Sequence, residues 1–426
     1  MALRVGFAEV DITPPVGTHK IGWIIDIVSD RVLDPLFARA AIFATETRRV
    51  AFIQLDTLSV RWTTVSDIRQ RIEGRYGFPG CCVMVAATHN HAGPAVASCG
   101  DVRRDDTYVG ALVGKVVSMF GEALGAAQKA ELGTGSCFEF RLSHNRRIIM
   151  RDGTVRTHGH FTDPLALCFE GPIDPEVAVM AARDRSGRTL GAVVNFACHP
   201  THHGGERSLS AGYPGVLARE MRARGCPVTL FLNGACGNVH HADPTDPERT
   251  DRTKEDIGRQ LAEDVEEVLA AMQWRAEAKL GHQSETVQLP FRKVTEEEVR
   301  GTARGAQRFV DPAAYDRHMP RLVESIRRME TQPAEVQALF IDDWAYVGIP
   351  AEYFVQHGLR IKEQSYPRHV VVVGHANGMV GYVPHREAFF RGGYETTFGL
   401  GSRLAPEAGD ILADCAVRLV REGPET

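Results

Sequence analysis

Six short apolar runs, rich in β-branched residues, limit what this chain can fold into. Each is nearly continuous, which is typical of strands buried on both faces. The runs cover residues 50–55, 83–87, 193–197, 228–232, 345–349 and 370–373. Helix-like segments, whose apolar residues recur at helical spacing, cover 105–127, 214–224 and 255–272. Strands that alternate with helices predict an α/β fold with a mixed central β-sheet flanked by helices.

The length of 426 residues exceeds the usual size of a single hydrophobic core. We expect one large elaborated domain over residues 1–426. A charged, helix-prone segment at about 285–330 interrupts the pattern and holds Pro290, Pro312 and Pro320. It is predicted to be an insertion or lid within that domain.

Composition and charge limit the classes of partner and the cellular compartment that we expect. The formal net charge of −5 argues against a nucleic-acid partner. The N-terminus lacks the apolar core of a secretion signal, and no apolar run approaches the ~20 residues that span a bilayer, so we expect no stable membrane insertion. Nine cysteines without a C-x-x-C pair argue against a disulfide framework and a thiolate zinc finger, and the vicinal Cys81–Cys82 pair is expected to be buried. These features predict a cytoplasmic protein and leave a homo-oligomer open.

Side chains capable of metal binding and acid–base chemistry follow the ends of the six runs. In open α/β sheets, ligands gather beyond the carboxyl ends of the strands. The residues there are Asp56; His89 and His91; His199, His202 and His203; 233–238; Glu352; and His375. Imidazoles held at several strand ends indicate one shared metal site, most simply a zinc (Zn2+) site.

The His89-x-His91 pair has a specific geometric meaning. Residues two apart in an extended segment face the same side, so one could bind the metal while the other reaches the substrate. His202 and His203, which follow His199 closely, could serve a second metal. No bridging carboxylate motif accompanies them, so we expect them to line the pocket or cap a turn.

Several other residues allow competing interpretations. Cys236, in the glycine-bearing turn 233–238, could act as a nucleophile, although a small buried cysteine after a strand is commoner. The same turn could present backbone N–H groups to an oxyanion. His158 and His160 follow a polar turn, which favours a surface position without function. The isolated histidines are expected to be structural: His144, His282, His318, His357, His369 and His385.

Short motifs, in order along most of the chain, resemble the catalytic domain of neutral ceramidases, zinc amidases that cleave the N-acyl bond of ceramide. Residues 6–15 look like the opening G-x-x-x-x-D-I-T-x-P of that family, and 87–94 resemble its T-H-T-H-S-G-P block. Residues 145–146 lie where the family has N-R-S-P. The later matches are at 196–200, at 349–352 (V-P-G-E in the family), at 377–382 and at 394–395. Each motif is short, but the ordered set is specific.

The resemblance implies a fold and a metal centre. The fold is that of the neutral-ceramidase catalytic domain, and the metal is zinc. The implied ligands are two imidazoles, a carboxylate and a phenolate, a reasonable set for Zn2+. They are His89, His199, Glu352 and Tyr382.

The resemblance also implies roles around the metal. His91 is the implied acid–base group, and Arg146 and Tyr394 would polarise the scissile carbonyl or hold its oxyanion. The zinc would lower the pKa of a bound water toward ~7. The implied reaction is hydrolysis of an amide C–N bond by metal-activated water.

Three departures from the family pattern bear on the substrate. The family's serine, tied to ceramide hydrolysis, falls on His240, which we expect to share the acid–base role. The chain ends soon after the motifs, leaving no room for the family's C-terminal β-sandwich domain, and it lacks the family's secretion signal. We therefore expect a zinc-dependent amidohydrolase acting on a small or medium, more polar amide. A zinc esterase or lactonase and a non-catalytic metal-binding protein are the alternatives. The number of metals and the roles of His202, His203 and His241 stay open.

Overall fold

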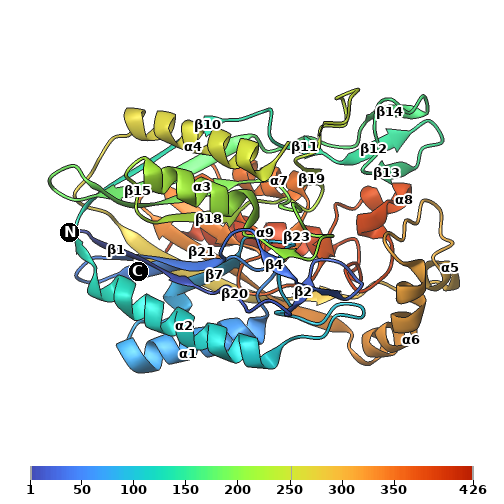
Figure 1. Cartoon of the computed structure of the whole chain (residues 1–426), viewed down its shortest axis with the longest axis horizontal. Helices are drawn as coiled ribbons and strands as arrows, with labels where there is room; N and C mark the ends of the chain where they lie inside the picture. The colour runs from blue at the N-terminus through green and yellow to red at the C-terminus, as the bar shows by residue number, and fades with distance from the viewer. Residues whose placement is uncertain (1, 251, 425–426) are drawn as a thin grey trace.

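In the computed structural model, which describes residues 2–250 and 252–424, all six predicted strands are present and form three parallel pairs (Figure 1). A parallel pair ends at the same edge of its sheet, so the residues that follow both strands meet there. The pairs are β6 (Arg49–Leu55) with β7 (Val83–Ala87), β16 (Thr189–Phe196) with β18 (Thr229–Asn233), and β22 (Trp344–Gly348) with β24 (His369–Val373).

Each parallel pair belongs to a different mixed sheet, so the single central sheet expected from the sequence is divided into three. The first sheet has the order β7-β6-β5-β1-β9, the second β10-β15-β16-β18 and the third β20-β21-β22-β24. The added strands are largely antiparallel: β1 (Arg4–Asp11), β5 (Phe37–Ala44), β9 (Gln128–Lys129), β10 (Glu131–Phe138), β15 (Glu176–Arg183), β20 (Leu280–Pro290) and β21 (Thr331–Ile341).

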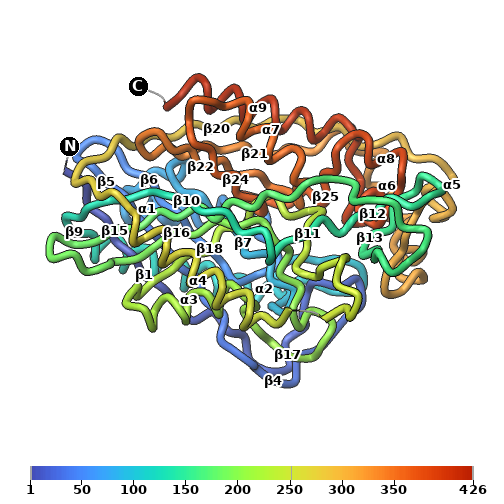
Figure 2. Tube along the Cα trace, turned by 90° about the horizontal axis from the view of Figure 1, so that it is seen from above, coloured from blue at the N-terminus to red at the C-terminus, as the bar shows by residue number. Residues whose placement is uncertain are grey.

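The inner faces of the three sheets share one core, and a helix pair covers each outer face. Phe52, Leu232 and Val371, one from each sheet, belong to the shared core. Neighbouring residues on the same strands face the helices, so each sheet is buried on both sides as the continuous apolar runs predicted. The helix pairs, visible on the outside of the molecule in Figures 1 and 2, are α1 (Trp62–Tyr76) with α2 (Asp106–Gly125), α3 (Gly212–Ala223) with α4 (Lys254–Ala271), and α7 (Val355–Gln364) with α9 (Ala408–Glu422).

Short elements complete the chain, and most of them gather at the right of Figure 1, away from both termini. The short strands are β2 (His19–Ile21), β3 (Ile27–Val28), β4 (Arg31–Val32), β8 (Gly93–Pro94), β11 (His144–Asn145), β12 (Arg147–Met150), β13 (Val155–Thr157), β14 (Ala166–Phe169), β17 (Ser208–Leu209), β19 (Val239–His240), β23 (Glu352–Tyr353) and β25 (Tyr382–Val383). The short helices are η1 (Gly80–Cys82), α5 (Glu296–Arg300), α8 (Ala388–Arg391) and η2 (Tyr394–Thr396).

The charged segment predicted at 285–330 begins later than expected. Residues 285–290 belong to β20, which pairs with β21 from Leu280↔Ile341 to Pro290↔Thr331. The exposed polar residues of this long arm, such as Glu285, resemble a solvated helix in sequence. Within the predicted segment, only α5 and α6 (Pro312–Arg328) are helical.

Helix α2 corrects the expectation that no segment is long and apolar enough to cross a membrane. Of the described helices, it alone meets that criterion by length and composition. Its buried residues Val109, Leu112 and Phe120 pack in the core between α1, α2 and the first sheet. This packing accounts for its apolar composition.

Candidate metal centre and pocket

Three imidazole nitrogens converge at the carboxyl ends of the first two sheets. His89 and His91 follow β7, and His199 follows β16. His89 has left-handed backbone geometry (φ 67°), which bends the chain immediately after the strand. The Nε2 atoms lie 3.0 Å (His89–His199), 3.3 Å (His89–His91) and 3.2 Å (His91–His199) apart.

A backbone carbonyl orients each of the three rings. The Nδ1 atom of His89 donates to the Leu58 oxygen at 2.8 Å. His91 Nδ1 donates to the Gly22 oxygen at 3.1 Å, and His199 Nδ1 to the Cys236 oxygen at 3.2 Å. A carbonyl only accepts, so the proton of each neutral ring is on Nδ1 and each Nε2 presents a lone pair. Three lone pairs aimed at one point repel each other unless a cation lies between them.

Glu352, which begins β23 shortly after β22 of the third sheet, supplies a fourth potential ligand atom. Its Oε2 lies 3.3 Å from His89 Nε2 and 3.9 Å from His199 Nε2. Zinc–nitrogen bonds of 2.0–2.1 Å at tetrahedral angles separate neighbouring ligand atoms by about 3.3 Å. The spacings among the three imidazole nitrogens therefore fit a tetrahedral cation, and the Glu352 carboxylate lies near two of them.

Burial keeps the imidazoles of His91 and His199 in the neutral form that binds metal. His89 and His199 are almost completely buried, and His91 is 8% exposed. Burial and the neighbouring His89 lower the pKa of His91 well below its ordinary value. Burial and Arg146 do the same to the pKa of His199.

The convergence differs from the ligand set that the family resemblance implies. That set has two imidazoles and assigns His91 to acid–base chemistry, whereas here His91 is as close to the centre as the other two. Tyr382, the fourth implied ligand, pairs with Glu352 across β23 and β25. Burial and Glu352 raise the pKa of Tyr382, and its hydroxyl accepts from Arg146 Nη2 at 3.2 Å. Tyr382 as a ligand and His91 as the acid–base group remain predictions.

Arg146 is fixed beside the centre by groups that the sequence did not reveal. Its Nε donates to Glu395 Oε1 at 2.8 Å, and its Nη2 donates to the Gly237 oxygen at 2.8 Å. Arg147 donates to the other oxygen of Glu395 at 2.6 Å. Burial opposes the charge on Glu395, but Arg147 and Arg146 outweigh it and lower the pKa of Glu395 to about 2. The guanidinium of Arg146 is therefore charged and held in place, as an oxyanion donor requires.

One pocket contains seven of the eight predicted site residues. They are His89, His91, Arg146, His199, Glu352, Tyr382 and Tyr394. Tyr394 stacks on Phe309 with ring centroids 5.0 Å apart. His158 is exposed, as the polar turn before it predicted, and it also lines the pocket.

His240 is the predicted site residue that does not line this pocket. Its Nδ1 accepts from the Ala242 N–H at 3.0 Å, so its Nε2 carries the proton and donates to Thr201 Oγ1 at 2.6 Å. Its ring lies edge-on to His158 at 4.8 Å. Both Thr201 and His158 line the pocket, and His240 lies behind them.

The walls of the pocket are largely apolar, which contradicts the expected preference for a polar substrate. Helix α6 contributes Ala314, Met319 and Leu322. The charges that dominate the sequence of α6 lie on its other face, and this is why the segment looked polar. The remaining apolar wall residues are Ile21, Trp23, Ile24, Leu58, Phe309, Val310 and Leu400.

Cys236 is poorly placed for nucleophilic catalysis. It is fully buried behind the pocket, with Sγ 3.3 Å from His375 Nε2. Burial and Glu352 raise the pKa of its thiol well above the ordinary value. The N–H groups of Gly234 and Gly237 in the same turn donate to the backbone oxygens of Phe196 and Tyr353, so they do not serve an oxyanion.

The histidines that suggested a second metal site, His202 and His203, do not form such a site. His203 Nδ1 lies 3.0 Å from the surface carboxylate of Glu206, and His202 Nε2 donates to the Arg252 oxygen. Within residues 2–250 and 252–424, two groups bring three potential ligand atoms within 4.8 Å of one another. One is His89, His91 and His199; the other is Cys81, Cys82 and His282.

Comparison with known proteins gives one consistent set of relatives. No family model matches the chain. The neutral ceramidase of Pseudomonas aeruginosa is 24% identical over 461 aligned residues, which span 90% of this chain and 67% of that protein. The crystal structure of neutral ceramidase from Pseudomonas aeruginosa has a TM-score of 0.77 at 20% identity and covers 100% of this chain and 76% of its own. A ceramidase complexed with C2 has a TM-score of 0.74 at 19% identity, with the same coverage. The predicted α/β fold is confirmed.

Proposed function

Because this chain is a homologue of neutral ceramidase, we propose that it is a zinc-dependent hydrolase of amide bonds. The observation that carries the proposal is the convergence of His89, His91 and His199 Nε2 with a Glu352 oxygen on the floor of the pocket. A storage or sensor site needs such a ligand set but has no use for a buried guanidinium beside it. Arg146 therefore favours catalysis over metal binding alone.

Different residues of the pocket would have different roles in hydrolysis. His89, His199 and Glu352 would hold the ion, with His91 or Tyr382 completing the set. A bound zinc ion supplies Lewis-acid polarisation and an activated water at neutral pH. Arg146, fixed by Glu395, donates to the oxygen of the scissile carbonyl, where negative charge develops.

The proton needs a neutral base near the carbonyl and a route to the leaving amine. Where Tyr382 completes the ligand set, His91 accepts the proton and returns it to the amine. His240 acts only through the Thr201 hydroxyl, which orients its ring and faces the pocket. The predicted replacement of the family's serine by His240 does not hinder this route, because no covalent intermediate is required.

The apolar wall supports a substrate with an apolar chain on its amide. Ala314, Met319 and Leu322 on α6 face the pocket. Burying these side chains against an apolar chain of the substrate is favourable by roughly 25 cal/mol per Å² of apolar surface removed from water. The potential metal ligands and Arg146 line the same pocket, where the amide would be cleaved. We therefore propose an N-acyl amide rather than a small polar amide.

Metal content and a substrate panel test the proposal together. Purified protein should hold about one zinc ion per chain at the imidazole and carboxylate ligands. N-acyl amides of increasing acyl length, with matched esters, should be assayed on that material. We expect amide turnover that improves with chain length. Full metal content without turnover would indicate a metal-binding protein, and turnover of esters alone would indicate an esterase.

A further inference from the structure

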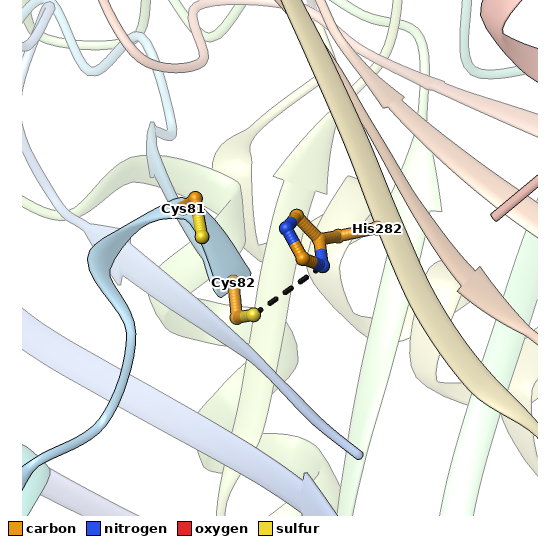
Figure 3. Close-up of side chains that lie close together, drawn as sticks. All are labelled: Cys81, Cys82 and His282. Carbon is orange, nitrogen blue, oxygen red and sulfur yellow. Dashed lines mark hydrogen bonds between the residues drawn. The ribbon is translucent and has the colours of Figure 1, made fainter. Parts of the chain in front are cut away.

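A second group of potential metal ligands lies outside the pocket (Figure 3). Cys81 and Cys82 belong to η1, immediately before β7, and His282 lies on β20. Cys82 Sγ lies 3.4 Å from His282 Nδ1, and the three ligand atoms are all within 4.8 Å of one another. Two hundred positions separate His282 from Cys82, so the sequence did not connect them.

The spacing suits a soft cation. Zinc–sulfur bonds of ~2.3 Å and zinc–nitrogen bonds of ~2.0 Å at tetrahedral angles place sulfur and nitrogen about 3.6 Å apart. The observed 3.4 Å needs little adjustment. We propose that Cys81, Cys82 and His282 form a binding site for a thiophilic d10 cation such as Zn2+, separate from the hydrolytic centre.

The backbone around the two cysteines is already held in place. Gln337 Nε2 on β21 donates to the Cys81 oxygen at 2.7 Å, and the Gly80 N–H donates to Glu73 Oε2 at 3.3 Å. His282 pairs with Leu339 in the register of β20 and β21. Because both sides are ordered, binding requires little rearrangement.

The exposure of Cys81 lets a cation reach the site from solvent. Cys81 is exposed, His282 is partly buried and Cys82 is buried, so the site opens to solvent on the Cys81 side. A water can take the fourth position there. On binding, each thiol releases its proton to solvent and the two thiolates bond to the cation.

The location suggests a structural role. Cys82 directly precedes β7 in the first sheet, and His282 belongs to the third sheet, so a bound cation would join the two sheets. The strand β7 separates this site from His89, which follows its other end. Occupancy should therefore stabilise the fold without entering the reaction.

Cadmium titration of the reduced full-length protein tests the site, because thiolate-to-cadmium charge-transfer absorption reports only thiolate ligands. The variants are Cys81→Ser, Cys82→Ser and His282→Asn, with Cys168→Ser as a control at another exposed cysteine. Cys81→Ser changes an exposed side chain, so it tests the site even if Cys82→Ser fails to fold.

We expect a band that saturates at one equivalent in the wild type and in Cys168→Ser. The band should be lost in Cys81→Ser and Cys82→Ser, and the affinity should fall at least tenfold in His282→Asn. Amide hydrolysis, measured without cadmium, should be unchanged in Cys81→Ser. A band that persists in Cys81→Ser, or that disappears in Cys168→Ser, would overturn the proposal.

Discussion

Two groups of histidines lie close together near the pocket, and only one of them can bind a metal. In the converging cluster (His89, His91 and His199), ring centroids are 4.4–5.1 Å apart. In the stacked cluster (His202, His240 and His241), the centroids are closer still, at 3.9–4.0 Å. Crowding of imidazoles therefore does not define a metal site.

The direction of the nitrogen atoms separates the two clusters. Carbonyl acceptors fix Nδ1 in the converging cluster, so all three Nε2 lone pairs face one point. In the stacked cluster, His240 Nε2 and His241 Nε2 approach Thr201 Oγ1 at 2.6 and 3.1 Å. The Thr201 hydroxyl accepts the His240 N–H, so that nitrogen presents no lone pair to a cation.

The largest effect should come from replacing a member of the converging cluster. His199→Ala removes one of three lone pairs and should abolish stoichiometric metal binding at this cluster, with a fall in kcat/KM of at least about 10³-fold. Elemental analysis and amide hydrolysis measure the two losses. Full activity without metal would contradict the proposed centre.

Thr201→Val is the matched control for the stacked cluster. It leaves the His240 N–H without its acceptor, which should cost about 1–3 kcal/mol of unfolding free energy in chemical denaturation. Metal content should stay at the wild-type level. Loss of metal in this variant would remove the distinction between the clusters.

His91→Ala tests whether His91 in the converging cluster is a metal ligand or the acid–base group. The spacing of His91 Nε2, 3.2–3.3 Å from its neighbours, favours a ligand role, so the zinc dissociation constant should rise at least about tenfold. Competition with a chromophoric chelator measures this constant. Unchanged zinc affinity with a fall in kcat of about 10²–10⁴-fold would instead identify His91 as the acid–base group.

The smallest effect concerns His158, which lies against the stacked cluster. Burial and Arg146 lower the pKa of His158 from 6.5 to about 4. Above pH 6.5 neither the folded nor the unfolded state is protonated there. As the pH falls from 6.5 toward 4, only the unfolded chain takes up the proton, so stability decreases. Because His158 is exposed to solvent, screening keeps this decrease below about 1 kcal/mol. His158→Gln should flatten this decrease in denaturation curves.

His357 provides a control for the pH effect. Burial also lowers the pKa of His357 to about 4, but this residue lies under α9, away from the pocket. His357→Gln should flatten the acid limb and keep wild-type turnover, whereas His158→Gln should alter turnover as well. An unchanged acid limb in both variants would show that neither side chain resists protonation.

The sequence predicted the parallel strands better than the antiparallel ones. Continuous apolar runs identify β6, β7, β16, β18, β22 and β24, because both faces of these strands are buried. Strand β20 is buried near its two ends and exposed in its middle, where it carries Glu285, so composition placed half of it in a helical insertion. The division into three sheets depends on pairings across the chain, which periodicity does not encode.

The sequence predicted which residues belong to the site better than it predicted where their side chains point. Strand ends gave His89, His91, His199 and Glu352, and the family resemblance added Arg146 and the two tyrosines. The left-handed backbone at His89, which turns its Nε2 toward the centre, has no signal in residue type. Glu395 was missed because a buried carboxylate is recognisable only beside its arginine partners.

The shared core behind the pocket makes the catalytic geometry depend on distant packing. His91, His199 and Glu352 are attached to three different sheets, and Phe52, Leu232 and Val371 set the spacing of those sheets. A cavity or an extra methyl group in this region would shift one ligand relative to the others. Inherited or engineered substitutions can therefore inactivate the protein while leaving every pocket residue intact.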